Sequence, residues 1–518
     1  MTSVRRLSLL FLLAGVAGAL SLCGCRGGDQ PDANCPTASR APRLKPDYTG
    51  TVIPCNIAPL NFSVEEPGTA YFAHLRGSDG ISLTVRSRTP HIVMSQGQWR
   101  RLVATEGSTL TLEVSVKAAD GRWQRFAPVT NTIGPPVDRY LAYRQIGQVF
   151  SYFRDIRVMQ RDLTGFAERQ VFWGGQAAEG CVNCHTFCNN RPELMTLGIR
   201  SGKYGNCALV ADHGRVTKMD AIWGYNSWHP SGQAVAYSMN KVRQFFHDAA
   251  MEVRDVVDLD SDVVVYRADT GAVESDPAIA DPDRLETYPS WSPDGKTLYF
   301  CSAPILWQDR ETVPPIRYAD LHYELRRVSY DLASHRFGRP ETVLPVEQAG
   351  RSILEPRVSP DGRWLLFCMC DYGCFPIYRP SSDLYLMDRR TGAYRRLDIN
   401  SDQSESWHSW SSNSRWIAFS SRRIDGVFTR TYFAHVDEQG RIAKPFILPQ
   451  RDPTFYDSFL KTFSVPEFIT APVQTTDREL ARAVRSDRKV KLTLPEVSMT
   501  RKSKQPSPTE PWQQSNQR

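Results

Sequence analysis

The strongest constraint on the fold is a motif that returns four times in the second half of this 518-residue chain. Each copy has an apolar residue, then a turn that reads Ser-Pro-Asp-Gly in two of the copies, then an alternating strand. The aligned apolar residues are Trp228, Trp291, Val358 and Trp410, spaced by 63, 67 and 52 residues. Later in each unit comes a further strand, over residues 262–266, 323–328, 383–387 and 431–436. Short sheets repeated at this spacing predict the blades of a β-propeller.

The repeats resemble the TolB-like propeller repeat over roughly residues 225–450. The resemblance implies a TolB-like propeller over residues 225–465, with strands from 198–224 or after 440 completing the ring. We expect the repeat residues to build turns and core. His229 and His408 occupy repeat positions and are expected to be structural as well.

Residues 50–134 also indicate β-structure. Leu110, Leu112, Val114 and Val116 alternate with polar residues, a period of two that is typical of a half-buried strand. Residues 119–122, Ala-Asp-Gly-Arg, then predict a hairpin turn. The fold class is therefore mainly β, beginning with an immunoglobulin-like sandwich over residues 50–134.

The first 25 residues indicate export and lipidation. Arg5 and Arg6 precede the uncharged stretch Leu7–Leu22, which is shorter than the roughly 20 residues of a spanning helix. The stretch ends in Leu22-Cys23-Gly24-Cys25, which resembles the bacterial lipobox and implies that Cys25 is lipidated. A plain signal peptide is the alternative. We expect residues 26–49 to form a tether, and the protein to be lipid-anchored in the cell envelope, facing the periplasm or the outer membrane.

The charge distribution argues against nucleic-acid binding. The net charge is 63 − 56 = +7, of which residues 1–26 carry +3 and residues 477–518 carry +5, leaving −1 for the body. A basic balance confined to the two ends provides no nucleic-acid groove. With 41% apolar and 23% charged residues, the chain is neither wholly disordered nor a polytopic membrane protein. The polar end predicts a disordered basic tail over residues 485–518.

The sequence Cys181-Val-Asn-Cys184-His185 is the strongest functional signal. Two cysteines at this spacing can each form a thioether with a haem vinyl group, and the next residue offers its imidazole to the iron. With 12 Cys and 10 His in the chain, chance would produce the motif on the order of 0.005 times. We therefore predict one covalent haem c, held by Cys181 and Cys184 with His185 as proximal iron ligand, in an irregular segment over residues 135–224.

Three alternatives compete for these cysteines. Cys181, Cys184, His185 and Cys188, with or without Cys207, carry ligands that suit zinc, although the loop between them is short. A redox-active Cys-x-x-Cys pair lacks the alternating strand and helix of a thioredoxin-like fold. A structural disulfide cluster is the third alternative, and an exported chain also permits the pairs Cys35–Cys55 and Cys188–Cys207.

The distal iron ligand is open between several residues. Met195 lies ten residues after His185, and its thioether would raise the reduction potential. Its rivals are Met219, His213, His229, Met239 and an open coordination position.

The run from Cys181 to Met195, followed by Trp228-His-Pro-Ser-Gly and Tyr237-Ser-Met-Asn, resembles envelope lipoproteins of Bacteroidetes- and Planctomycetes-type bacteria. These join a cytochrome c attachment motif to a TolB-like β-propeller, and the resemblance spans about residues 137–465. It implies a haem packed against the propeller instead of a free-standing cytochrome domain.

Two further clusters carry weaker signals. Asp255, Asp258, Asp260 and Asp262 offer oxygen ligands without an EF-hand pattern, and we interpret them as turns and strand edges of a solvated blade. Cys368, Cys370 and Cys374 put three thiols within seven residues, as a disulfide element or a small metal site.

These observations predict a membrane-anchored c-type cytochrome that passes single electrons to an envelope redox or scaffold partner docked on the propeller. One alternative is an interaction or sensor lipoprotein in which the haem is structural. Another is a peroxidase-like enzyme with an open haem iron. We do not expect a hydrolytic enzyme, because no convincing nucleophile motif occurs.

Overall fold

The computed structural model describes residues 30–32, 34–147, 153–247, 254–307 and 317–493. Cys25 and most of the predicted tail lie outside these residues. Within the described part, no helix combines the length and apolar character needed to cross a bilayer.

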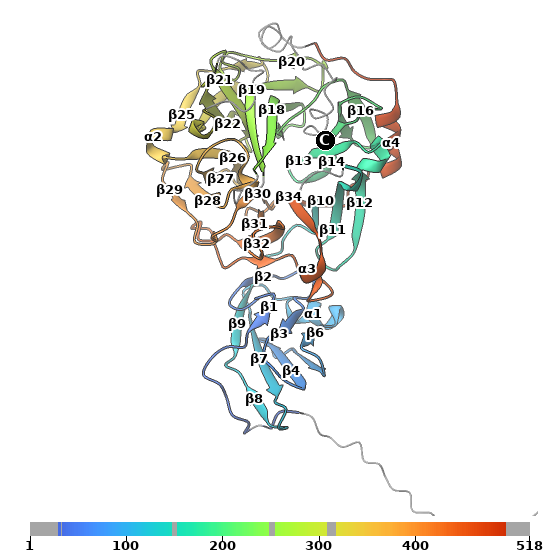
Figure 1. Cartoon of the computed structure of the whole chain (residues 1–518), viewed down its shortest axis with the longest axis vertical. Helices are drawn as coiled ribbons and strands as arrows, with labels where there is room; N and C mark the ends of the chain where they lie inside the picture. The colour runs from blue at the N-terminus through green and yellow to red at the C-terminus, as the bar shows by residue number, and fades with distance from the viewer. Residues whose placement is uncertain (1–29, 33, 148–152, 248–253, 308–316, 494–518) are drawn as a thin grey trace, which may run out of the picture.

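The N-terminal domain is a sandwich of two sheets, as predicted (Figure 1). The smaller sheet contains β1 (Leu44–Lys45), β3 (Phe62–Val64) and β6 (His91–Ile92). The larger has the order β2 (Val52–Pro54), β9 (Val129–Gly134), β7 (Thr109–Lys117), β4 (Ala70–Gly77) and β5 (Ser82–Ser87), with β8 (Trp123–Arg125) paired to β7. Helix α1 (Gln96–Leu102) packs beside β5.

The predicted strand over residues 109–117 is confirmed. Leu110, Leu112, Val114 and Val116 are all buried, and the hairpin to β8 turns at Gly121, whose φ is 86°. Residues 26–49 are not a free tether throughout. β1 pairs with β3, and Arg40 forms an ion pair of 2.6 Å with the buried Glu66, because this segment supplies an edge of the smaller sheet.

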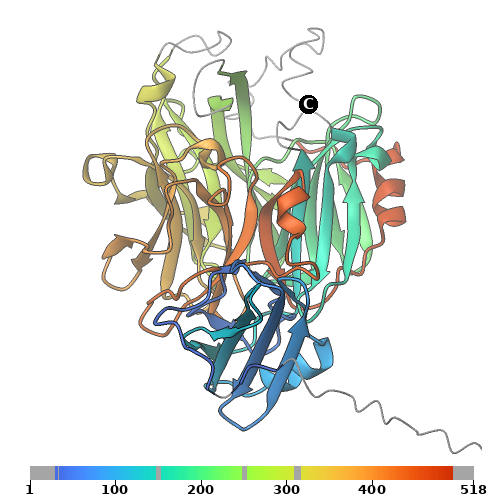
Figure 2. The ribbon, with the colours of Figure 1, turned by 60° about the horizontal axis from the view of Figure 1, so that its bottom comes forward.

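The rest of the described chain forms six sheets arranged around one axis (Figures 1 and 2). Sheet 1 contains β34 (Lys461–Ile469), β10 (Tyr140–Gly147), β11 (Arg157–Asp162) and β12 (Glu168–Trp173); sheet 2 contains β13 (Cys181–Cys188), β14 (Arg191–Arg200), β15 (Cys207–Asp212) and β16 (Arg215–Met219). Sheet 3 contains β17 (Asn226–Trp228), β18 (Ala234–Phe246), β19 (Arg254–Arg267) and β20 (Val273–Glu274); sheet 4 contains β21 (Arg284–Trp291), β22 (Thr297–Pro304) and β23 (Glu324–Asp331), with β24 (Arg336–Phe337) and β25 (Glu341–Leu344) on β23. Sheet 5 contains β26 (Ser352–Val358), β27 (Trp364–Cys370), β28 (Asp383–Asp388) and β29 (Tyr394–Arg396); sheet 6 contains β30 (Glu405–Trp410), β31 (Trp416–Ser421), β32 (Arg430–His435) and β33 (Phe446–Ile447).

The innermost strands contact one another around the axis. β34 contacts β13, and the contacts continue through β17, β21, β26 and β30 back to β34. Sheet 1 joins both ends of the propeller, because β34 pairs with β10 from residues about 320 positions earlier, such as Ser464 with Arg144. The described residues from β10 to β34 therefore form a β-propeller of six blades.

The segment 135–224 differs from the expectation. It was expected to be irregular, but it forms sheets 1 and 2, so the propeller begins at β10 and not at residue 225. Sheet 2 lacks the Ser-Pro-Asp-Gly turn of sheets 4 and 5. Its first hairpin instead turns at Asn189 and Asn190, both with positive φ, which asparagine tolerates better than most residues.

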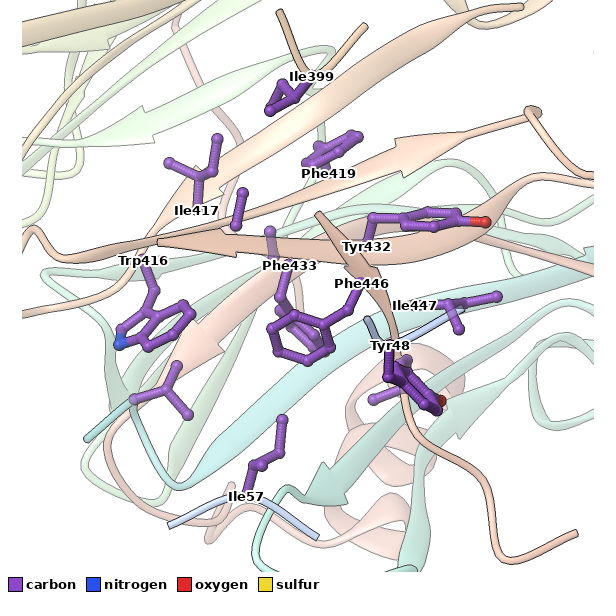
Figure 3. Close-up of a cluster of buried hydrophobic side chains, with 14 of the residues drawn as sticks. Tyr48, Ile57, Ile399, Trp416, Ile417, Phe419, Tyr432, Phe433, Phe446 and Ile447 are labelled. Atoms are coloured by element: carbon purple, nitrogen blue, oxygen red, sulfur yellow. The ribbon is translucent and has the colours of Figure 1, made fainter. Parts of the chain in front are cut away.

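A hydrophobic cluster joins the two domains (Figure 3). Tyr48 of the N-terminal domain meets Phe446 edge-on, with ring centroids 6.5 Å apart. Trp416 is fully buried, and its Nε1 donates to the carbonyl of Pro135 at 3.0 Å, in the connection between the domains.

The folded part of the chain extends beyond residue 485, where the disordered tail was predicted to begin. Helix α3 (Phe455–Ser458) precedes β34, and α4 (Asp477–Arg485) follows it against β12 and β16. Lys218 Nζ then donates to the carbonyls of Val484 and Ser486 at 2.7 and 3.0 Å. Residues 485–493 are therefore part of the folded body, whereas residues 494–518 lie outside the described residues.

Replacing Trp416 tests the domain contact. We expect Trp416→Ala to lower the apparent free energy of unfolding by about 3–5 kcal/mol, because it removes a fully buried indole and its hydrogen bond to Pro135. Urea denaturation followed by tryptophan-independent circular dichroism measures this. Leu460→Ala is the control, since Leu460 is 72% exposed and the change should stay within about 0.5 kcal/mol. A loss below about 1 kcal/mol for Trp416→Ala would contradict the packing described.

Candidate functional site

Five of the six innermost strands carry the same bulge. In each, the register with the second strand shifts at a residue with φ between 48° and 56°: Cys184, Tyr288, Glu355, Trp407 and Val465. The next residue is His185, Pro289, Pro356, His408 or Pro466. The predicted haem-attachment motif therefore ends in the propeller repeat itself, with His185 and His408 at equivalent positions of sheets 2 and 6.

These bulges surround a small axial pocket. Every innermost strand contributes to its lining, including Cys184, His185, Glu355, His408 and Glu467. The enclosed space is about 40 Å³, which is enough for a few water molecules. Polar and titratable groups thus converge at the centre of the fold.

Aromatic rings occupy much of the axis. Tyr225 stacks on Tyr288 with centroids 3.9 Å apart, and Trp407 lies 5.6 Å from Tyr225. Tyr288 donates its hydroxyl hydrogen to the carbonyl of Cys374 at 2.7 Å. This packing accounts for the small volume of the pocket.

His185 is a buried imidazole without a hydrogen bond. It is 2% exposed, and neither ring nitrogen has a hydrogen-bond partner. Burial, assisted by the positive charge of Arg144, lowers the pKa of His185 to about 3. The ring is neutral at pH 7, which is the state that binds a metal ion.

His408 is held differently. Its Nε2 lies 3.1 Å from the carbonyl of Leu366, so this nitrogen carries the hydrogen and donates it. Its Nδ1 lies 3.6 Å from Cys368 Sγ, which is also 3.5 Å from Glu355 Oε2. Burial lowers the pKa of His408 to about 3 and raises that of Glu355 to about 7. His408, Glu355 and Cys368 were not predicted together as a site. Aligning His185 with His408 in the repeat would have indicated His408 as a candidate residue.

The two cysteines of the predicted motif lie on β13 in different surroundings. Cys184 lines the axial pocket, whereas Cys181 belongs to the hydrophobic core between sheets 1 and 2. Burial raises the pKa of both thiols, and the positive charges of Arg200 and Arg144 oppose this at both. Both sulfurs thus lie in the field of the same two guanidinium groups.

More positive charge is buried nearby. The guanidinium groups of Arg254 and Arg422 lie 5.7 and 5.6 Å from the centroid of the Tyr378 ring, and all three residues are buried. Burial lowers the pKa of both arginines. This environment favours a negatively charged group near the motif.

These features allow a test of the predicted haem. The donor set fits, because His185 is neutral with unbonded nitrogens, the thiols are close in sequence, and buried arginines can offset propionate charge. The space beside His185 is far smaller than the roughly 300 Å³ at which ligand pockets begin. Attachment of a porphyrin therefore requires the aromatic rings on the axis to move.

Met195 and its rivals lie away from the axial pocket. Met195, on β14, is 1% exposed in the core between sheets 1 and 2, and Met219 and Met239 pack in the core between sheets 2 and 3. His213 is exposed beside Asp212, and His229 packs on Trp291 and contacts the carbonyl of Gly295. None of them lines the pocket of His185.

The other predicted cysteine arrangements are not formed. All ten described cysteines are free, so neither the pair Cys35–Cys55 nor Cys188–Cys207 is bonded. Cys188 Sγ faces the carbonyl of His229 at 3.5 Å, and Cys207 packs in the core, so neither joins His185 in a zinc site.

The aspartates of β19 are buried, and their interpretation as solvated strand edges is wrong. Asp255, Asp258, Asp260 and Asp262 are at most 3% exposed. Arg379 pairs with Asp255, and Asn240 and Tyr323 donate to Asp258 at 3.1 and 3.0 Å, which is why the carboxyls of Asp255 and Asp258 tolerate burial. Burial raises the pKa of Asp258 to about 6.

Comparison with known proteins yields fold similarity alone. No protein-family model matches the chain, and no curated protein matches its sequence. Oligogalacturonate lyase in complex with manganese is 12% identical with a TM-score of 0.32, over 77% of this chain and 99% of the lyase. The oligogalacturonate lyase of Vibrio parahaemolyticus is 11% identical with a TM-score of 0.31, over 65% of this chain and 100% of the lyase. The Dos1 propeller is 12% identical with a TM-score of 0.31, over 52% of this chain and 62% of the Dos1 chain. Nothing about activity follows from similarity at this level.

The buried Glu467 predicts a pH-dependent stability. Burial raises its pKa from 4.5 to about 7, against the opposing charge of Arg357. A carboxyl with a raised pKa in the folded state favours folding when protonated, and that stability is lost as the pH rises through about 7. Glu467→Gln should therefore remove about 2–3 kcal/mol of the decrease in the free energy of unfolding between pH 5 and pH 8.

Urea denaturation at the two pH values measures this effect. Glu347→Gln, at an exposed position of α2 (Val346–Ala349), is the control and should leave the decrease unchanged. Equal pH dependence in Glu467→Gln and the unchanged protein would contradict a raised pKa at Glu467.

Proposed function

We propose that this chain is a membrane-anchored c-type cytochrome built on a β-propeller, which exchanges single electrons with an envelope redox or scaffold partner. The observation that carries the proposal is His185, a neutral, buried imidazole without hydrogen bonds that directly follows Cys184 on the axis. Lipidation of Cys25 would hold the protein at the cell envelope.

In this proposal, each residue of the motif has a separate role. Cys181 and Cys184 attach the haem through thioethers, and His185 offers an imidazole nitrogen to the iron without first losing a proton. The haem, when bound, supplies one-electron chemistry. Arg144 and Arg200 place positive charge near both sulfurs, and the innermost strands bury the imidazole of His185.

The spectrum of the protein tests this proposal. Expression with a haem-maturation system should give α and β absorption bands on reduction, and a mass increased by one haem. Cys181→Ser with Cys184→Ser should abolish both, because no thiol remains to form a thioether. Cys188→Ser is the matched control on the same strand and should keep both. An unmodified mass of the unchanged protein would overturn the proposal.

A second cavity favours the alternative of a binding or sensor lipoprotein. It lies on the axis beyond the bulges, measures about 330 Å³, and is lined by residues that include Trp228, Trp291 and Trp410. This size lies at the lower end of ligand pockets. A haem-loaded protein that holds a small ligand there, without electron exchange with any partner, would favour this alternative.

A further inference from the structure

Three metal-ligating side chains from sheets 5 and 6 meet beside the axial pocket. Glu355 comes from β26, Cys368 from β27 and His408 from β30, and one ligand atom of each lies within 4.8 Å of the others. Their exposed fractions are 4%, 0% and 4%. None of the three belongs to the predicted haem-attachment motif.

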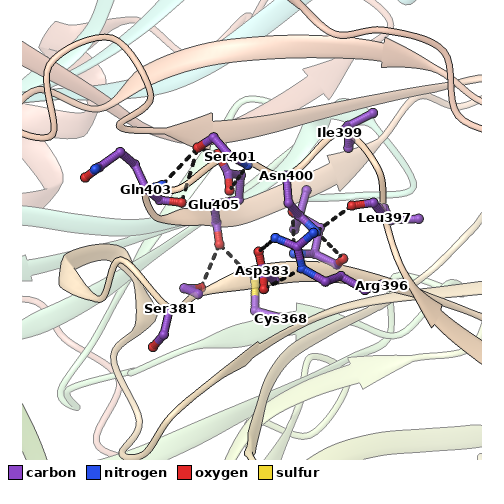
Figure 4. A network of polar contacts seen from close by, with 12 residues as sticks. Cys368, Ser381, Asp383, Arg396, Leu397, Ile399, Asn400, Ser401, Gln403 and Glu405 are labelled. Atoms are coloured by element: carbon purple, nitrogen blue, oxygen red, sulfur yellow. Dashed lines mark hydrogen bonds and ion pairs between the residues drawn. The ribbon is translucent and has the colours of Figure 1, made fainter.

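The thiol of Cys368 faces more hydrogen-bond acceptors than it has hydrogens to donate. Its sulfur lies 3.5 Å from Glu355 Oε2, 3.6 Å from the Glu405 carbonyl and 3.6 Å from His408 Nδ1; Figure 4 shows the contact with Glu405. When Glu355 is ionised, all three are acceptors, and a thiol has one hydrogen to donate. Lone pairs of at least two of these groups therefore point at the sulfur without a hydrogen between them.

His408 is oriented like a metal ligand. Its Nε2 donates to the carbonyl of Leu366, which leaves the lone pair of Nδ1 directed toward Cys368. Ligating histidines are commonly fixed through the other ring nitrogen in this way. Glu355 Oε2 is positioned by the Trp407 amide, which donates to it at 2.6 Å.

Unbonded buried polar atoms provide an independent indication of a ligand. Glu355 Oε1 is buried without a hydrogen-bond partner, and so are both nitrogens of His185. His185 lines the same pocket as Glu355 and His408. A cation between Glu355, Cys368 and His408 would bind the acceptor atoms that face it. The hydrogen bonds of the described structure leave these acceptors unsatisfied.

We propose that Glu355, Cys368 and His408 bind a divalent transition-metal ion of the zinc type. A carboxylate, a thiolate and an imidazole together suit zinc, and three protein ligands leave one position open toward the axial pocket, where His185 lies. The thiol proton of Cys368 leaves to solvent when the metal binds. The site does not depend on haem attachment.

Cobalt titration of the chelator-treated full-length protein tests the site. Co²⁺ should bind at one equivalent per chain and give a thiolate-to-cobalt charge-transfer band, which Zn²⁺ should remove by displacement. Cys368→Ser should abolish the band and weaken binding at least tenfold. Cys370→Ser is the matched control, because Cys370 is equally buried on the same strand and directs its sulfur to the Tyr372 carbonyl instead.

Two further variants separate loss of metal binding from misfolding and from loss of haem attachment. Glu355→Gln preserves shape and should weaken Co²⁺ binding while circular dichroism stays unchanged, so a misfolded Cys368→Ser protein does not decide the outcome. Cys181→Ser with Cys184→Ser, which cannot attach haem, should retain the cobalt band. The absence of a charge-transfer band in the unchanged protein, or its loss only with Cys181 and Cys184, would overturn the proposal.

Discussion

The pairing of β34 with β10 is the interaction on which the propeller depends. It completes sheet 1 with strands from opposite ends of the propeller, so that β13 and β30 both find a neighbour on the axis. Arg144 reinforces this pairing, since its Nε donates to Ser464 Oγ at 3.1 Å and its guanidinium group also contacts Asn183 on β13. One residue thus links the last strand to the strand that carries Cys181 and Cys184.

The bulge of the innermost strands explains how a regular fold produces a chemically varied centre. A residue with positive φ rotates the strand locally and directs the side chains around it toward the axis. Proline follows the bulge in three strands, where it has no backbone N–H to donate, whereas histidine follows it in two. The same backbone position therefore holds either a proline that packs on the axis or an imidazole that we propose as a metal ligand, according to the residue that occupies it.

The sequence repeat was sufficient to predict the blades around Trp228, Trp291, Val358 and Trp410, because their turns and alternation are local signals. Strands from residues 198–224 or after 440 were expected to complete the ring, and β15, β16 and β34 do so. The earlier strands of sheets 1 and 2 were missed because they lack the turn of the repeat, and because the pairing of β34 with β10 leaves no local signal. Residues 184–187, Cys-His-Thr-Phe, do match Trp-His-Ser-Trp at 407–410, and that comparison would have placed the motif on the axis.

The candidate site was predicted unevenly for a similar reason. The spacing of Cys181, Cys184 and His185 is visible in one line of sequence. Glu355, Cys368 and His408 come from three strands of two sheets, and only the closed packing of those sheets brings their ligand atoms together. The burial of the β19 aspartates was equally hidden, since Arg379 lies more than a hundred residues away.

The long sequence separation between β34 and β10 also sets an order of events during folding. Contacts between distant segments form late, because the chain entropy lost in closing the intervening loop must be offset first. Until β34 emerges and docks, the edge of sheet 1 stays open and the side chains of β13 remain accessible from that edge. The haem that we propose would have its best opportunity to reach Cys184 in this interval, before the last strand closes the axis.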